Sequence, residues 1–310
     1  ALALLTRAQR LAPSDARIHR ARGWVIRRLG RYEEAVDAFE RSLALDPLGA
    51  EGWKVLDSYM HARRYDRLLE IARRLAAEDP QGSAIIATWW EVTVAAVRDG
   101  DLTGANRMLE HWPAIFHTSY VDDPRVNAPW STWLLGLNDT EIASLASGVE
   151  DLLPSAGGSP LSLSFALAFR AWALHDVLGH PDARDAALAY ERAADGMLAT
   201  ANTPQLAVGI LGQRAMNYLR LGEPERAVAL ADSLTRAFPP GLDEWWSSPQ
   251  ARRVRAAVYA RVGRQGEAID ILKPLVPPPS HYTLALLRID PTWEPLRSHP
   301  RWAEILEAAR

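Results

Sequence analysis

Two histidines and two aspartates lie close together in the second half of the sequence and are the best candidates for catalysis or metal binding. They are His175, Asp176, His180 and Asp182. A His-Asp pair can ligate a metal or act as a general base, but residues five apart point to different sides of a helix. His180 also precedes Pro181 in an expected turn. The sequence therefore favours a polar helix end here over a hydrolase or metal site.

Other patterns of enzyme chemistry are absent from the sequence. It contains no glycine-rich phosphate loop, HExxH, GxSxG or nucleotide-binding fingerprint. It has no cysteine, which excludes disulfides and thiolate metal sites. The net charge of -3 gives no electrostatic case for nucleic acid, and no run approaches the roughly 18 apolar residues that a membrane helix needs. We expect no enzyme, no cofactor, no metal, no nucleic-acid binding and no direct membrane insertion.

A small residue, a glycine seven positions later and an alanine five positions after that recur along the chain. The triplets are Gly23–Gly30–Ala35, Thr93–Gly100–Ala105, Ala215–Gly222–Ala227 and Ala256–Gly263–Ala268. A small residue lets two helices cross closely, and a glycine just past a helix end takes the left-handed cap conformation. The triplets therefore predict antiparallel helix hairpins along an all-α chain.

This pattern resembles the tetratricopeptide repeat, a helix–turn–helix unit of 34 residues. The clearest copies are 16–47 and 208–239, and the span from Pro13 to Pro47 is 34 residues. Degenerate copies are expected over 49–80, 84–113 and 160–200; in the last, Arg184 stands where alanine is expected and leaves the register open. The resemblance implies an α-solenoid of about six to seven hairpins that share a continuous core.

The strength of the pattern divides the chain into four parts. They are an N-terminal lobe (1–112), an irregular helical connector (113–159), a C-terminal lobe (160–279) and capping helices (280–310). Within the connector, 139–153 has the pattern of a helix, with Asp139 as its cap. The capping segment resembles the end of tetratricopeptide regions in bacterial transcription activators and serine/threonine kinases. Its expected apolar anchors are Trp293, Leu296, Trp302, Ile305 and Leu306.

The first residues match the second helix of a hairpin whose first helix is missing. We expect the natural protein to continue upstream, or a partner to cover this end, so the chain is expected to belong to a larger complex or a longer polypeptide. Lys54 and Lys273 are the only lysines, an arginine bias typical of GC-rich bacterial genes. The compartment is open, with the cytoplasm favoured over the outer face of a membrane-anchored protein.

In tetratricopeptide arrays the first helix of each pair lines a concave groove, where peptides or partner helices dock. By resemblance, the groove residues here are Arg17, Arg20, Trp24, Arg27, Arg28, Lys54, Ser58, His61, Trp90, Val94 and Arg98. Such a basic groove suits an acidic peptide or tail, because arginine binds carboxylates bidentately. The alternative is a solvated arginine face paired with glutamates of its own chain.

Two tryptophan doublets add to the candidate surface. Neighbouring residues on a helix point roughly 100° apart, so at most one of Trp89 and Trp90 is expected to face fully inward, and Trp90 is the candidate for exposure. Trp245 and Trp246 precede a helix, and either an exposed surface or the junction between the lobes suits them. Exposed aromatic side chains are favoured anchors of protein interfaces.

These features predict a binding module, a scaffold or accessory subunit that holds a partner protein or peptide in its groove. The alternative function is a regulatory or sensor arm of a bacterial kinase or transcription activator whose effector domain lies outside this chain. A helical hydrolase acting through His175 and Asp176 is the third and weakest hypothesis.

Overall fold

The computed structural model describes residues 1–47, 55–78, 84–109, 132–152 and 160–310, and these ranges contain helices and no strand. The first helices are α1 (Leu2–Leu11), α2 (Ala16–Arg28), α3 (Tyr32–Leu45), α4 (Leu56–His61), α5 (Tyr65–Glu78), α6 (Ala84–Asp99) and α7 (Asn106–Leu109). They are followed by α10 (Asp139–Leu152), α11 (Pro160–Trp172), α12 (Ala183–Thr200), α13 (Pro204–Arg220), α14 (Pro224–Ala237), α15 (Ser247–Arg261) and α16 (Gln265–Leu272). The last are α17 (Leu284–Ile289), α18 (Glu294–Arg297) and α19 (Trp302–Ala308). The expected all-α architecture is confirmed.

The recurring triplets form the crossing point and the turn of each hairpin. The turn glycines have φ between 73° and 82° and are Gly30, Gly100, Gly222 and Gly263. The alanines that follow them are at most 1% exposed and are Ala35, Ala105, Ala227 and Ala268. A methyl group on Gly23 would lie 2.5 Å from Cε1 of the fully buried Phe39. Glycine at this position therefore allows α2 and α3 to pack closely.

The hairpin of α11 and α12 has a longer turn than the others. The buried alanine three residues after the start of the second helix is Ala35 in α3 and Ala227 in α14. In α12 this position belongs to Ala186, which is 1% exposed, whereas Arg184 is exposed. The π-helical η4 (Ala173–Val177) and the residues after it lengthen the turn, so Arg184 does not replace the alanine.

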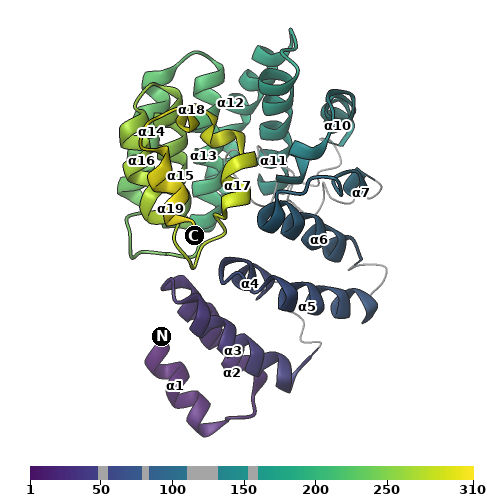
Figure 1. Cartoon of the computed structure of the whole chain (residues 1–310), viewed down its shortest axis with the longest axis vertical. Coiled ribbons are helices and arrows are strands. Elements are labelled where there is room, and N and C mark those ends of the chain that lie inside the picture. Colours follow the sequence, from purple (N-terminus) through teal and green to yellow (C-terminus); the bar gives the residue numbers. More distant parts are fainter. Residues whose placement is uncertain (48–54, 79–83, 110–131, 153–159) are drawn as a thin grey trace.

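Each hairpin packs against the next, as a solenoid requires. α3 contacts α4, α5 contacts α6, α12 contacts α13 and α14 contacts α15. Buried apolar side chains from Ile26 to Ala309 form one contiguous core, and a smaller cluster lies among α11, α12 and α13. Figure 1 shows the stacked helices running from the N-terminal hairpins to the C-terminal lobe. The predicted α-solenoid is confirmed, while the four-part division of the chain stays a prediction.

The end of the chain returns to the N-terminal lobe. α17 packs against α6 (Figure 1), and η6 (Pro291–Trp293) leads into α18. The expected anchors are buried: Trp293, Leu296 and Ile305 at 0% exposure, and Trp302 at 8%. Leu306 is partly buried against the same core. The closing segment therefore belongs to the core of the molecule.

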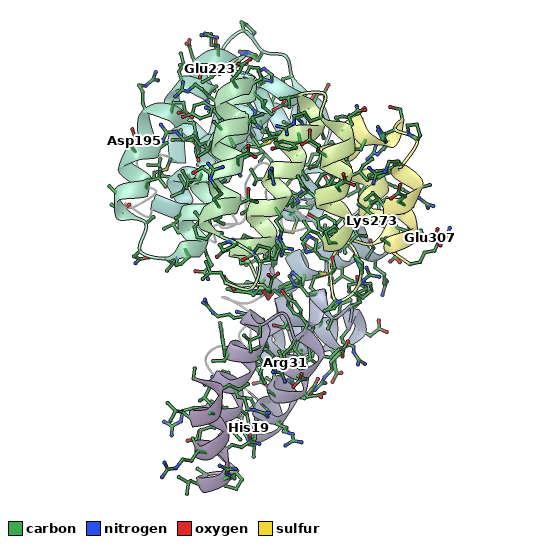
Figure 2. All side chains as sticks on the ribbon, turned by 90° about the vertical axis from the view of Figure 1, so that its left-hand side faces the viewer. His19, Arg31, Asp195, Glu223, Lys273 and Glu307 are labelled. Carbon is green, nitrogen blue, oxygen red and sulfur yellow. The ribbon has the colours of Figure 1, made fainter. Side chains whose placement is uncertain are left out.

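The N-terminal helix is the least covered part of the described chain. α1 contacts α2 but has no buried residue, and Leu4 and Leu11 are 72% and 78% exposed. In Figure 2 the first hairpin, where His19 and Arg31 are labelled, projects from the rest of the molecule. Whether the natural protein continues upstream stays a prediction.

The helix expected within the connector is present as α10, but its cap differs from the expected one. Asn138 Oδ1 accepts from the Glu141 backbone N at 3.0 Å, and Glu141 Oε2 accepts from the Asn138 backbone N at 2.8 Å. Asn138, one residue earlier than the expected Asp139, is therefore the cap, because this reciprocal pair satisfies two free backbone donors. No helix within the described ranges is long and apolar enough to cross a membrane.

Candidate functional site

Five of the expected groove residues lie on α2. Residues three or four apart share one side of a helix, so Arg17, Arg20, Trp24 and Arg28 form a single stripe. The Arg17 side chain is 85% exposed, and Arg28 is also exposed. Trp24 is half-buried, with its ring edge against Phe39 at 6.4 Å between centroids. We call Arg17, Arg20, Trp24 and Arg28 the α2 stripe.

Several of these arginines are paired with carboxylates of their own chain. Arg17 binds Asp15 at 2.8 Å, and these hydrogen bonds lower the pKa of Asp15 to about 2. Arg20 lies 3.1 Å from Asp46. Arg98, on α6, lies 2.9 Å from its neighbour Asp99 and 3.5 Å from Asp66 of α5. The partners are aspartates of the same chain, where the alternative expected glutamates, and the choice between a binding groove and a solvated face stays a prediction.

Arg27 does not line an open groove, contrary to the expectation. It is 1% exposed, and its guanidinium carbon lies 4.6 Å from the ring centroid of Trp24 and 3.7 Å from that of Trp245. Its Nη1 is 3.3 Å from Asp57 Oδ1. Burial lowers the pKa of Arg27. The C-terminal lobe covers the end of α2, so Arg27 is part of the contact between the two lobes.

Four further groove candidates are also buried, among them Ser58 at 0% and Val94 at 1% exposure. His61 is 7% exposed and stacks on Tyr32 with 4.8 Å between ring centroids. Trp90 is 4% exposed and Trp89 is 6% exposed, so the expectation that Trp90 faces solvent is wrong. α6 contacts α5 and also η2 (Thr132–Gly136) and α17, so neighbouring sides of the helix are both covered. Lys54 lies outside the described residues.

The burial of Arg27 and His61 comes from a contact between segments far apart in the sequence. The Tyr32 hydroxyl donates to the carbonyl oxygens of Glu244 at 3.2 Å and Trp245 at 3.3 Å. The Glu244 backbone N donates to Arg28 O at 2.9 Å. Trp245 Nε1 donates to Asp57 Oδ2 at 2.7 Å. Of the two positions left open for Trp245, the junction of the lobes is the one it occupies.

Arg63 makes a second part of this junction. Its guanidinium donates to the carbonyl oxygens of Ser280 at 3.1 Å, Tyr282 at 2.8 Å and Ala309 at 3.2 Å. In the same junction, the Thr283 hydroxyl donates to the carbonyl oxygen of Val97. Sequence reasoning missed Arg63, although a signal was present. Its position, 33 residues after Gly30, is the turn position that holds glycine in the clearest copies.

A cavity of about 380 Å³ lies within the junction and is lined by Tyr32, His61, Trp245, Gln250, Arg253 and His281, among others. His281 Nδ1 is 3.4 Å from His61 Nε2. Burial lowers the pKa of His61, and burial together with the neighbouring His61 lowers that of His281 well below its usual value. The two imidazoles are therefore neutral in this packing.

The His175–Asp176 pair is placed at a helix end, as expected. It borders an open hollow of about 1120 Å³ that Met216, Leu219 and Arg220 also line. Asp176 Oδ2 accepts from the buried Arg220 Nε at 2.7 Å, so the carboxylate is committed to an ion pair. In the part of the chain that is described, no three His, Asp or Glu side chains are arranged to hold a metal ion.

Comparisons with known families agree with this geometry in both lobes. Family models described as tetratricopeptide repeat match residues 16–48 and residues 213–278. The first match covers α2 and α3, and the second extends from within α13 to beyond α16. No curated protein matches the chain. Two segments of the chain are thus similar to tetratricopeptide repeats, which generally mediate contacts between proteins, and the described residues form an all-α solenoid.

Proposed function

We propose that this chain is a scaffold or accessory subunit that binds an acidic segment of a partner protein along the first helices of its N-terminal lobe. The observation that carries the proposal is the α2 stripe. It places three arginines around a half-buried tryptophan on one side of α2, and its two ends, Arg17 and Arg28, are exposed. Arginine forks bind carboxylates, and tryptophan and arginine are enriched among the anchors of protein interfaces.

The internal ion pairs of the stripe are compatible with this role. Arg17 and Asp15 are both solvent-accessible, and exposed ion pairs of this kind contribute little to stability. A partner carboxylate that approaches Arg17 therefore displaces a weak contact. Arg27 takes no part in this exchange, because it is buried between Trp24 and Trp245.

The test reverses the two exposed charges of the stripe. A chain carrying Arg17→Glu and Arg28→Glu is compared with a control carrying Arg41→Glu and Arg236→Glu, two exposed arginines outside the stripe. Both changes alter the net charge equally. A partner is captured from native lysate, identified by mass spectrometry, and its affinity is measured with each purified variant.

We expect the stripe variant to bind the partner roughly tenfold or more weakly, since opposite charges become like charges. The control variant should bind as the unaltered chain does. Equal affinity for both variants, with unchanged helicity by circular dichroism, would remove the α2 stripe as the partner site. Arg27 is left unaltered because reversing a buried charge would disturb the fold.

A second candidate function, the regulatory arm of a bacterial signalling protein, is favoured by the way the closing segment connects the lobes. Arg63 of the N-terminal lobe donates to carbonyls of Ser280, Tyr282 and Ala309. A partner bound to one lobe could thus be sensed by the other. Sequencing the gene beyond both ends of this chain tests the idea, which requires a coding region for a kinase or transcription-activator domain.

A further inference from the structure

Trp245 is held by the N-terminal lobe as a ligand is held by a binding site. Its indole N–H donates to Asp57 of α4 at 2.7 Å. Its ring centroid lies 3.7 Å from the guanidinium carbon of Arg27, and the same carbon lies 4.6 Å from the ring centroid of Trp24. Cation–π stacking is stronger on a desolvated arginine than on an exposed one. The hydrogen bond to Asp57 and the stacking on Arg27 together fit an indole side chain.

The backbone on either side of the indole is bound as well. The Glu244 N–H donates to Arg28 O, and the Tyr32 hydroxyl donates to the carbonyls of Glu244 and Trp245. A Cβ atom on Gly30 would lie 3.1 Å from Glu244 Cβ, so the segment passes close over the turn between α2 and α3. Main-chain contacts of this type give affinity, and the side-chain contact gives specificity.

The acidic side chains of the same segment are engaged elsewhere. Asp243 Oδ2 accepts from Ser247 Oγ at 2.8 Å and from Gln205 Nε2 at 3.0 Å. The Glu244 carboxylate binds Arg252. All of these partners belong to the C-terminal part of the chain. The hydrogen bonds to the N-terminal lobe therefore come from the tryptophan and its backbone, while Asp243 acts on Arg27 through its charge.

We propose that Trp24, Arg27, Tyr32 and Asp57 form a recognition site for a tryptophan on an extended segment, which Trp245 occupies in cis and a tryptophan of a partner protein occupies in its place. The inference rests on the proposed scaffold function and defines a feature of the partner. The α2 stripe binds the acidic part of the partner segment, and this site binds a tryptophan next to it.

Exchange at this site does not require the lobes to separate. Trp245 is half-buried and lies in the connection between α14 and α15. The contacts of Arg63 with Tyr282, and of Thr283 with Val97, do not involve Trp245 and hold the lobes together. A tethered ligand competes at an effective concentration in the millimolar range. Only a partner with several contacts would displace it, which keeps the site closed to weak competitors.

The test uses a fluorescent synthetic peptide with the sequence of residues 239–250 as the probe and the full chain with Trp245→Ala as the receptor. Trp246→Ala is the matched control. Trp246 is the neighbouring residue, and within the described part of the chain it has no hydrogen bond to the N-terminal lobe. A second probe is the same peptide with Trp245→Ala. Binding is measured by fluorescence anisotropy.

We expect the unaltered peptide to bind the Trp245→Ala chain roughly tenfold or more tightly than the unaltered or Trp246→Ala chain, since only the first lacks the cis competitor. The peptide without Trp245 should bind none of them. Adding Asp57→Asn to Trp245→Ala should weaken binding roughly tenfold, because the indole N–H then donates to a neutral amide oxygen in place of a carboxylate. Trp245→Phe, which keeps the ring without the N–H, should give an intermediate result.

Equal binding of the peptide to the Trp245→Ala and unaltered chains, or equal binding of the two peptides, would overturn the inference. Circular dichroism shows that each variant is folded. If a partner is captured through Arg17 and Arg28 while the peptide does not bind, the tryptophan site is overturned and the scaffold function stands. If the peptide binds and the partner's affinity is unaffected by the stripe variant, the scaffold site of the α2 stripe fails instead.

Discussion

Arg63 has a backbone conformation that residues other than glycine seldom adopt. Its φ is 54°, in the left-handed region where the turns of the clearest hairpins hold glycine, such as Gly30 at 76° and Gly222 at 77°. An L-residue there costs about 1–2 kcal/mol. Its three hydrogen bonds to carbonyls of the closing segment offset this cost. Arg63 thus has an unfavourable backbone conformation, and its side chain forms a contact between the lobes.

A pair of substitutions separates the two effects. Arg63→Ala removes the three hydrogen bonds and keeps the unfavourable backbone conformation, whereas Arg63→Gly removes the hydrogen bonds and relieves the backbone. We expect both to lower the free energy of unfolding, and Arg63→Ala to lower it by about 1 kcal/mol more than Arg63→Gly. Urea denaturation followed by tryptophan fluorescence measures the difference.

A stabilised Arg63→Gly variant would contradict this account. If Arg63→Gly is more stable than the unaltered chain by about 1 kcal/mol, the arginine contributes only strain and its contacts are worth nothing. The same substitution type at Arg31, an exposed arginine paired only locally with Glu34, provides a baseline for lost surface charge.

At the scale of elements, α4 and the segment before α17 meet through two histidines. His61 Nδ1 is 2.8 Å from Asp57 O, which only accepts, so this nitrogen carries the proton. His61 Nε2 is then the acceptor, and His281 Nδ1, 3.4 Å away, is the donor. Both rings are neutral in this arrangement. The groups around them are the cations Arg27, Arg63 and Arg253, the acid Asp57, and the phenols of Tyr32 and Tyr282.

This pair makes the stability of the molecule depend on pH. The pKa of each histidine is lower in the folded chain than the ordinary value of 6.5, because burial disfavours the charged ring. The unfolded chain therefore binds more protons, and the free energy of unfolding rises with pH. The stabilisation is present above about pH 6.5 and is lost as the pH falls below that value.

We expect the free energy of unfolding to fall by about 2 kcal/mol between about pH 7.5 and about pH 5.5. Urea denaturation at a series of pH values measures it. His281→Gln, which keeps a neutral donor, should remove about half of this dependence, whereas His180→Gln, at an exposed turn, should leave it unchanged. A pH dependence that persists equally in both variants would exclude the His61–His281 contact as its source.

At the scale of the molecule, the chain's own C-terminal segments cover part of the surface formed by α2, α4 and α6 of its N-terminal lobe. The contact at Trp245 covers the end of α2, and α17 packs against α6. The covered part includes Arg27 and His61, while Arg17 stays exposed. The surface left for a partner is therefore shorter than the groove expected from the repeats.

The absence of cysteine permits a direct test of this closed form. A Cβ atom on Gly100, at the end of α6, would lie 3.7 Å from Ala285 Cβ of α17, close to the disulfide mean of about 3.8 Å. We expect Gly100→Cys with Ala285→Cys to form an intramolecular disulfide on mild oxidation, seen as faster migration on a non-reducing gel. Gly222→Cys with Ala285→Cys is the control.

The control pair also places a cysteine at a position of positive φ, but that position has no described side chain near it. Gly222 has a φ of 77°, close to the 73° of Gly100, and a Cβ atom there meets nothing within 4 Å. Both pairs therefore start from a similar local strain. If neither pair forms an intramolecular disulfide, α17 does not rest on α6 in solution.

Features that depend on near neighbours could be predicted from the sequence. The triplets identified the turn glycines and the buried alanines, because a helix hairpin needs a left-handed residue and a small residue at fixed spacing. The closing anchors, such as Trp293 and Leu296, were identified for a similar reason, since large apolar residues on one side of a helix pack inward. Local chemistry therefore determined the fold class and the pairing of helices.

The tertiary structure alone decided which of the groove residues are accessible. Trp90, Arg27 and His61 are on the helices that were expected, yet all three are buried. Arg27 contacts Trp245 and His61 contacts His281, both distant in the sequence. The repeat pattern specifies contacts between successive hairpins, while the small rotation of each repeat accumulates along the array. The position of the last hairpins depends on the sum of these rotations. The contact between Asp57 and Trp245 therefore has no signature in the spacing of either residue.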